Sequence, residues 1–240
     1  MNQKVLAKLI SFAGCDKLGL FKIALASSCL MIVPQGQVRA ASIPILNHSF
    51  ESPIAPVQSD GYYSINSIIG WSLHPSNGAY QGVLDPTKSQ NLTGRDFFYG
   101  LQPVPDGNQV AYNNGGTIAQ ALSAVLQPNT RYTLGVDVGR RKSLTFPNYR
   151  IRLIAGTTEL GFNSVTPDPG TFERVTVSYT SGSSGPLIGQ QLKIFLVSSG
   201  AQTNFDNVTL DASSIPEPSA ILGLLGFGLL GIASKLQQKR

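Results

Sequence analysis

The chain has 240 residues, 42% of them hydrophobic, and a formal net charge of +5. The excess positive charge lies at the two ends, because residues 41–215 hold ten basic and eleven acidic side chains, a net of −1. A near-neutral central region lacks the basic surface on which non-specific nucleic-acid binding depends, so we expect no nucleic-acid partner.

The first forty residues have the pattern of a secretory signal peptide. Four lysines accompany an apolar run at 23–33, and Val38-Arg39-Ala40 ends the segment with the small-x-small pattern of a cleavage site. We predict a signal peptide at 1–40 with cleavage after Ala40, and lipidation of Cys29 is the alternative. Both cysteines of the chain lie in this segment, so the mature protein is expected to have neither a disulfide nor a thiol nucleophile.

Residues 41–213 are predicted to form one all-β domain outside the cytoplasm. Short runs of alternating apolar residues are separated by clusters of Gly, Pro, Asn, Asp and Ser, which is typical of strands and their turns. Residues 117–126 fit both strand alternation and helical spacing, and we interpret them as a strand because two glycines precede them and Pro-Asn follows. The other expected strands are 131–138, 149–154, 174–179, 191–197 and 205–210.

Four short motifs follow one another along this domain: LNHSFE at 46–51, Gly-Trp at 70–71, YTLGVDVG at 132–139 and FDNVTL at 205–210. In this order they resemble the galactose-binding-like fold of many carbohydrate-binding modules and extracellular domains. The resemblance implies a jelly-roll β-sandwich. Fold alone does not give function, since this architecture carries many unrelated binders.

Few side chains of the mature chain suit catalysis. It has two histidines, His48 and His74, and it lacks the G-x-S-x-G elbow, the Walker loop and the H-E-x-x-H zinc motif. Asp85, Asp96 and Asp106 stand at positions where aspartate commonly forms turns. We therefore expect a domain that is not an enzyme.

Aromatic side chains gather in the first half of the domain. They are Tyr62, Tyr63, Trp71, Tyr80, Phe97, Phe98, Tyr99 and Tyr112. Sugars bind by stacking on such rings, and the run Asp96, Phe97, Phe98, Tyr99 combines rings with a carboxylate, so we predict that it binds carbohydrate. Trp71 is interpreted as a core residue. The one local basic run, at 140–142, is interpreted as a solvated loop.

Two acidic residues, Glu51 and Asp206, are predicted to hold a structural Ca²⁺. Asp206 lies on the same face of its strand as Val208 and Leu210, and an inward carboxylate needs a cation, a hydrogen-bond network or a route to solvent. Glu51 closes the expected first strand, and related jelly rolls join their chain ends through calcium. Carboxylate oxygens suit this ion. The alternative is that Asp206 caps a turn at the start of its strand.

The C-terminal segment 214–240 combines three features. Pro216, Glu217 and Pro218 come first, an uncharged apolar run follows at 220–233, and the chain ends in a basic tip. As a helix the run would span about 21 Å, less than the roughly 30 Å of a hydrocarbon core. We predict one short transmembrane helix with a cytoplasmic basic end, and a buried C-terminal helix is the alternative.

This order of features resembles the PEP-CTERM sorting signal of Gram-negative bacteria. The resemblance implies an exosortase partner that cuts near Pro216, Glu217 and Pro218. We expect an exported protein that passes through an inner-membrane intermediate to the envelope, surface or extracellular matrix, where its sandwich contacts exopolysaccharide. The alternative is a structural surface protein without a small ligand, anchored by its C-terminal helix.

Overall fold

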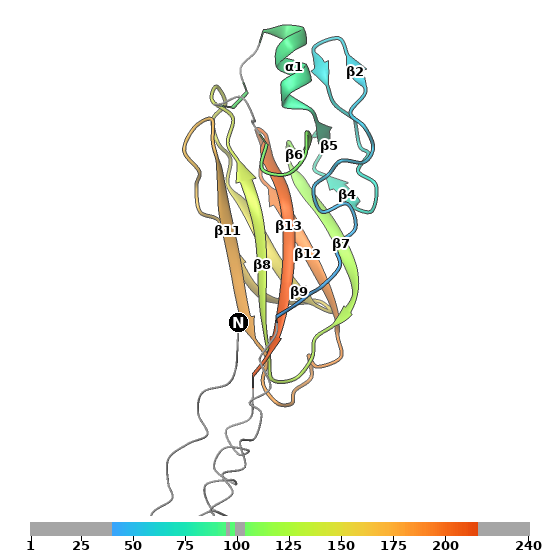
Figure 1. Ribbon diagram of the computed structural model, residues 1–240, viewed down its shortest axis with the longest axis vertical. Coiled ribbons are helices and arrows are strands. Elements are labelled where there is room, and N and C mark those ends of the chain that lie inside the picture. The colour runs from blue at the N-terminus through green and yellow to red at the C-terminus, as the bar shows by residue number, and fades with distance from the viewer. Residues whose placement is uncertain (1–39, 95–96, 99–103, 216–240) are drawn as a thin grey trace, which may run out of the picture. The chain divides into compact units, whose positions relative to one another are not determined.

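The computed structural model describes residues 40–94, 97–98 and 104–215, which form a sandwich of two antiparallel β-sheets (Figure 1). The first sheet contains β1 (Ala41–Ser42), β5 (Gln81–Leu84), β6 (Val110–Asn113), β8 (Thr130–Gly139), β11 (Phe172–Thr180) and β13 (Thr203–Ser214). The second contains β4 (Ser72–Pro75), β7 (Gly116–Val125), β9 (Tyr149–Ala155), β10 (Thr158–Asn163) and β12 (Gln191–Ser198).

The order of strands is β11-β8-β13-β6-β5 in the first sheet, with β1 beside β13, and β10-β9-β12-β7-β4 in the second. A two-stranded hairpin, β2 (Val57–Gln58) and β3 (Gly61–Tyr62), and one helix, α1 (Pro86–Thr93), lie together at one end of the sandwich (Figure 1). The predicted jelly-roll β-sandwich is confirmed.

The alternation that predicted the strands also fills the core. Leu134 and Val136 of β8 and Ile151 and Leu153 of β9 are fully buried, and they belong to one cluster of apolar side chains from both sheets. Side chains of a strand alternate between its faces, so each strand contributes every second residue to this layer. Residues 117–126, for which helix and strand were both considered, lie almost entirely in β7.

Trp71 is a core residue, as predicted. Its side chain is 7% exposed, and its ring centroid lies 5.2 Å from that of Phe50. The indole N–H donates a hydrogen bond to the carbonyl oxygen of Asn47 at 3.3 Å.

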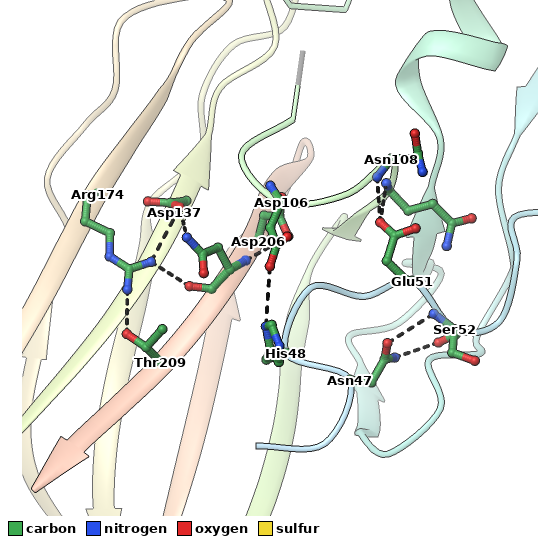
Figure 2. A network of polar contacts seen from close by, with 12 residues as sticks. Asn47, His48, Glu51, Ser52, Asp106, Asn108, Asp137, Arg174, Asp206 and Thr209 are labelled. Carbon is green, nitrogen blue, oxygen red and sulfur yellow. Dashed lines mark hydrogen bonds and ion pairs between the residues drawn. The ribbon is translucent and has the colours of Figure 1, made fainter. Parts of the chain in front are cut away.

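Residues 46–49 form a turn where the expected first strand would run towards Glu51. Asn47 and Phe50 have positive φ angles, and β1 is limited to two residues near position 41. Glu51 therefore does not end a strand. The Asn47 side chain supports the turn, because its Oδ1 accepts the N–H of Ser52 at 3.0 Å and its Nδ2 donates to the carbonyl of the same residue at 2.6 Å (Figure 2).

Helix α1 was not predicted. Asp85 is its N-cap and accepts the backbone N–H of Lys88 at 2.8 Å, while Pro86 occupies the first turn, where its missing N–H leaves no bond unmade. We associated Asp85 with a turn, but an aspartate followed directly by proline is also a helix-start signal.

Several predicted segments lie outside the described residues. They are the signal peptide up to residue 39, Asp96 and Tyr99, the Pro216-Glu217-Pro218 motif and the apolar run 220–233. Within the described ranges, the chain has no helix that is both long and apolar enough to cross a membrane.

Candidate functional site

A pocket of about 350 Å³ lies beside α1, between the loop that follows β3 and the ends of β5 and β6. Four aromatic residues line it: Tyr63, Tyr80, Phe97 and Tyr112. Its volume falls in the range of small-molecule sites, which are typically apolar with a few polar groups. All four rings belong to the aromatic group noted in the sequence, although only Phe97 was assigned to a site.

Close packing over β5 positions two of these rings. A side chain at Gly82 would place its Cβ 2.3 Å from the Ser64 carbonyl oxygen, so the loop that carries Tyr63 can cross the strand only at a glycine. The ring of Tyr63 then meets that of Tyr112 edge-on, with centroids 6.2 Å apart. Burial raises the pKa of Tyr112 well above its ordinary value, and its hydroxyl donates to Ser64 O at 2.7 Å.

A carboxylate and a guanidinium also line the pocket. The Tyr63 hydroxyl donates to Asp60 Oδ1 at 2.8 Å, and this bond raises the pKa of the tyrosine. The Arg141 guanidinium carbon lies 4.0 Å from the ring centroid of Phe97, and its Nη1 donates to Gln202 Oε1 at 2.7 Å. A negative and a positive group are thus held among aromatic walls.

The carbohydrate site predicted at Asp96, Phe97, Phe98 and Tyr99 is only partly within the described residues. Phe97 and Phe98 are 5% and 2% exposed, and the Phe98 ring packs at 4.6 Å on that of Phe172. Neighbouring side chains cover both rings, so neither offers an exposed face to a sugar, and carbohydrate binding by this run stays a prediction. Phe97 instead forms part of the pocket wall.

Sequence reasoning missed Asp60 and Arg141. Arg141 belongs to the basic run that we interpreted as a solvated loop, yet its side chain is half-buried beside Phe97. The backbone N–H of Lys142 donates to the carbonyl of Phe97 at 3.0 Å, which fixes this loop against the pocket. Neither Asp60 nor Tyr63 belongs to a sequence motif that indicates a site, and Tyr63 was noted only as one of the aromatic residues of the first half.

Glu51 and Asp206, the two carboxylates predicted to bind calcium, both hold the loop that leads into β6 (Figure 2). Asp206, which is fully buried, accepts the backbone N–H groups of Asp106 at 2.9 Å and Asn207 at 2.7 Å. Glu51 Oε1 accepts the backbone N–H groups of Asn108 and the residue after it, both at 2.7 Å. Both side chains therefore fix the segment that leads into β6.

Burial raises the pKa of Asp206 to about 8, although its two backbone hydrogen bonds act in the opposite direction. Asp106 and Asp137 raise it further. Each of these neighbours has a partner of its own, since His48 Nδ1 lies 3.6 Å from Asp106 and an Arg174 nitrogen 3.4 Å from Asp137 (Figure 2).

Asp137, on β8, is itself buried. Arg174 and the Asn207 amide, whose Nδ2 donates to it at 2.9 Å, cover it there. No group of three or more His, Cys, Asp or Glu side chains in the described ranges is arranged to hold a metal ion. Calcium at Glu51 and Asp206 stays a prediction.

Comparison with known proteins identifies two regions. The family model described as HpiC1 cyclase matches residues 41–211, and the PEP-CTERM protein-sorting motif matches residues 214–239. No curated protein matches the chain significantly.

Among solved structures, the chain is similar to the Stig cyclase Fisc from Fischerella sp. TAU, which was solved in complex with (3Z)-3-(1-methyl-2-pyrrolidinylidene)-3H-indole. The two chains are 30% identical with a TM-score of 0.63, and the match covers 74% of this chain and 100% of that one. It is also similar to a cyclase from Fischerella sp. TAU in complex with 4-(1H-indol-3-yl)butan-2-one, with 29% identity, a TM-score of 0.61 and coverage of 74% and 100%. For the apo form of a cyclase from Fischerella sp., the identity is 30%, the TM-score 0.61 and the coverage 74% and 98%.

The sorting motif confirms that the chain carries a PEP-CTERM signal. It is an exported, envelope-associated protein with an exosortase as its processing partner.

The expectation that the sandwich is not an enzyme is wrong. The matching family and these structures are cyclases. The expectation rested on the absence of nucleophile, phosphate-loop and zinc motifs, and those three motifs do not cover every class of enzyme. Because the family model spans the whole sandwich and the Fischerella cyclases share its fold, the chain belongs to the HpiC1-like cyclase family.

Proposed function

We propose that this protein is an exported cyclase that closes a ring in a small molecule bearing a flat aromatic group, and that the reaction takes place in the pocket beside α1. The observation that carries the proposal is the lining of four aromatic rings in a chain of a cyclase family. Two similar cyclases have indole compounds bound, which supports an indole or a related ring as the aromatic part.

The chemistry of the walls suits such a reaction. Ring closure through an electron-poor carbon spreads positive charge over the substrate, and aromatic faces attract a cation at short range. Tyr63, Tyr80 and Tyr112 supply such faces in a site that is partly closed to water. A flexible substrate held in a folded conformation also loses less entropy when its reacting carbons meet.

Asp60 is the group proposed to exchange a proton with the substrate. Its carboxylate lies at the pocket and is oriented by the Tyr63 hydroxyl at 2.8 Å. In the proposed step the Asp60 carboxyl gives a proton to an alkene of the substrate, and the aromatic ring attacks the resulting carbocation to form the carbon–carbon bond. The carboxylate then takes back the proton that the attacked ring loses, so one proton is given and one is returned. Because the raised pKa of Tyr63 keeps its hydroxyl protonated, the tyrosine positions Asp60 and does not act as the base.

The place of action follows from the sorting signal. We propose that an exosortase removes the segment after Pro216-Glu217-Pro218 from an inner-membrane intermediate and that the cyclase then acts in the envelope or the surrounding matrix. Contact between the sandwich and exopolysaccharide stays a prediction, and affinity electrophoresis of the secreted protein in that polysaccharide tests it.

The function is tested by binding and turnover. The exported protein should bind 4-(1H-indol-3-yl)butan-2-one, the compound bound by a similar cyclase, in isothermal titration calorimetry. Tyr80→Ala should weaken binding by about five- to tenfold, the effect of one lost aromatic contact. Asp60→Asn should bind normally and lose most of its turnover of alkenyl-indole substrates.

Phe162→Ala is the matched control, because Phe162 is an exposed aromatic residue of β10 that does not line the pocket. Absence of both binding and ring closure in the wild-type protein would rule out the proposed function. Equal weakening by Tyr80→Ala and Phe162→Ala would place the site elsewhere.

A further inference from the structure

The outer face of the second sheet carries a row of aromatic and cationic side chains. Arg152 of β9 lies directly opposite Phe162 of β10 on one side and Phe195 of β12 on the other, so the three side chains share one face. The residues between them on β9 and β12 are fully buried in the core, which places the row on the side away from it. Arg150 and Lys193, each two residues earlier on its strand, extend the row into a cationic face of five residues.

Aromatic rings hold the two arginines of this cationic face. The Arg150 guanidinium carbon lies 4.4 Å from the ring centroid of Phe162, and that of Arg152 lies 5.7 Å from the centroid of Phe195. A guanidinium over a ring keeps its N–H groups at its edge, where two of them can bond one carboxylate. Because the rings already restrict both side chains, less conformational entropy is lost when a partner binds.

The positive charge of the cationic face is only partly neutralised within the domain. Arg152 forms an ion pair with Glu159 of β10. Arg150 and Lys193 form no ion pair with any residue that the structure describes. Three cations thus stand against one carboxylate, although residues 41–215 as a whole have a net charge of −1. A local excess of positive charge favours an anionic partner.

We propose that the cationic face binds an acidic polysaccharide whose sugars bear carboxylate groups. The row crosses three adjacent strands, a distance of roughly 10 Å, and such an extended surface suits a chain of sugars better than one small ligand. Phe162 is 48% exposed, which leaves part of its ring for the apolar face of a sugar. Arg150 and Lys193 then bond the carboxylates of the chain.

This second surface is separate from the pocket beside α1. None of the residues that line the pocket belongs to β9, β10 or β12. The inference therefore does not depend on the proposed cyclase function. Binding to a polysaccharide would keep the exported protein in the matrix while its pocket stays open to small molecules.

An anionic membrane is the competing partner. Segments that lie on a membrane insert apolar side chains among the lipids. Both phenylalanines of the cationic face lie against a guanidinium, which would have to enter the membrane with the ring. The sorting signal also takes the chain out of the cytoplasm, where nucleic acid is found. A polysaccharide is thus the polyanion that fits the face best.

The test is affinity electrophoresis of the exported protein in native gels that contain alginate, a polymer of uronic acids, or neutral dextran. Alginate should retard the wild type, and dextran should not. Arg150→Gln should raise the apparent Kd for alginate about five- to tenfold, the effect of losing a charge-assisted contact. Phe162→Ala should raise it about threefold, since it removes the ring that holds the guanidinium. Mobility in dextran corrects for the altered charge of each variant.

Arg131→Gln is the matched control, because Arg131 is an exposed arginine of β8 in the other sheet and its loss changes the net charge equally. Its affinity for alginate should equal that of the wild type. Equal mobility of the wild type in alginate and dextran, or equal weakening by Arg131→Gln and Arg150→Gln, would contradict the inference. Binding to phosphatidylglycerol vesicles without retardation in alginate would also overturn it, in favour of a membrane. Arg150→Gln should bind 4-(1H-indol-3-yl)butan-2-one as the wild type does, so failure of the inference and failure of the proposed function are distinguishable.

Discussion

Aromatic side chains of this protein have two distinct roles that burial separates. Trp71 is 7% exposed and packs on Phe50, whereas Tyr80 is 53% exposed at the pocket. A buried ring contributes to stability by the apolar area that it removes from water, while a ring at the opening of a pocket is free to contact a ligand.

Trp71→Ala should therefore lower the free energy of unfolding by about 3–5 kcal/mol, because it leaves a large cavity in the core. Tyr80→Ala should change it by no more than about 0.5 kcal/mol, as expected for an exposed side chain. Urea unfolding followed by fluorescence and circular dichroism measures both. Similar losses in the two variants would mean that Tyr80 also belongs to the core.

Asp206 links stability to pH. Its pKa of about 8 in the folded chain, raised by burial from 3.8, means that the native state holds one more proton than the unfolded state between pH about 4 and 8. In the absence of a metal ion, the contribution of Asp206 to the free energy of unfolding is fully present below pH about 4. It is lost as the pH rises to about 8, by at most about 1.4 kcal/mol per pH unit. Thermal melts in chelator across this range measure the effect, and Asp206→Asn should abolish it.

Calcium should counteract this loss if it binds at Glu51 and Asp206. A bound cation stabilises the ionised carboxylate, so excess calcium should raise the melting temperature more at pH 8 than at pH 5. Asp206→Asn should not respond to the ion. A wild-type melting temperature that is the same in calcium and in chelator at pH 8 would contradict the predicted calcium site.

At the scale of elements, α1 connects the hairpin to the pocket. Ser89 of the helix accepts the N–H of Tyr62 at 2.8 Å and lines the pocket, while Asp85 caps the helix and forms an ion pair with Lys88 at 3.0 Å. A short helix depends on its cap, because isolated helices of this length are marginal in water.

Asp85→Ala should lower the free energy of unfolding by about 1–2 kcal/mol, since it removes the N-cap bond of a buried side chain. Lys88→Ala removes only the half-exposed partner of the ion pair and should have an effect below about 1 kcal/mol. Chemical denaturation compares the two variants, and ligand titration should show weaker binding for Asp85→Ala alone. Equal effects would show that the ion pair, not the cap, holds the helix.

At the scale of the whole molecule, the sorting signal predicts two processing events. The mature protein should begin at Ala41, and exosortase cleavage near Pro216-Glu217-Pro218 should remove the C-terminal segment. Mass spectrometry of envelope and secreted fractions measures both ends. Glu217→Ala should accumulate the unprocessed chain, whereas recovery of wild-type chains that all end at Arg240 would contradict cleavage and favour a permanent anchor.

Local sequence patterns were enough to predict the features that depend on neighbouring residues. Strands such as β8 and β12 follow from the alternation of apolar side chains, which is a local property with a period of two. The C-terminal sorting signal is likewise a linear pattern, and the family model confirms it. Burial of Trp71 followed from its apolar surroundings.

The position of the pocket and the identity of its lining residues depend on the tertiary fold and could not be predicted from local patterns. The lining residues come from separate loops and do not form one short motif in the sequence; they include Asp60, Tyr63, Phe97, Asn114 and Arg141. Pairing of β5 with β6 and of β6 with β13 brings these loops to one end of the sandwich, and such pairings join residues far apart in the chain. Sequence reasoning saw the aromatic residues as a group but not their common wall, because strand order is set by long-range packing and not by local alternation.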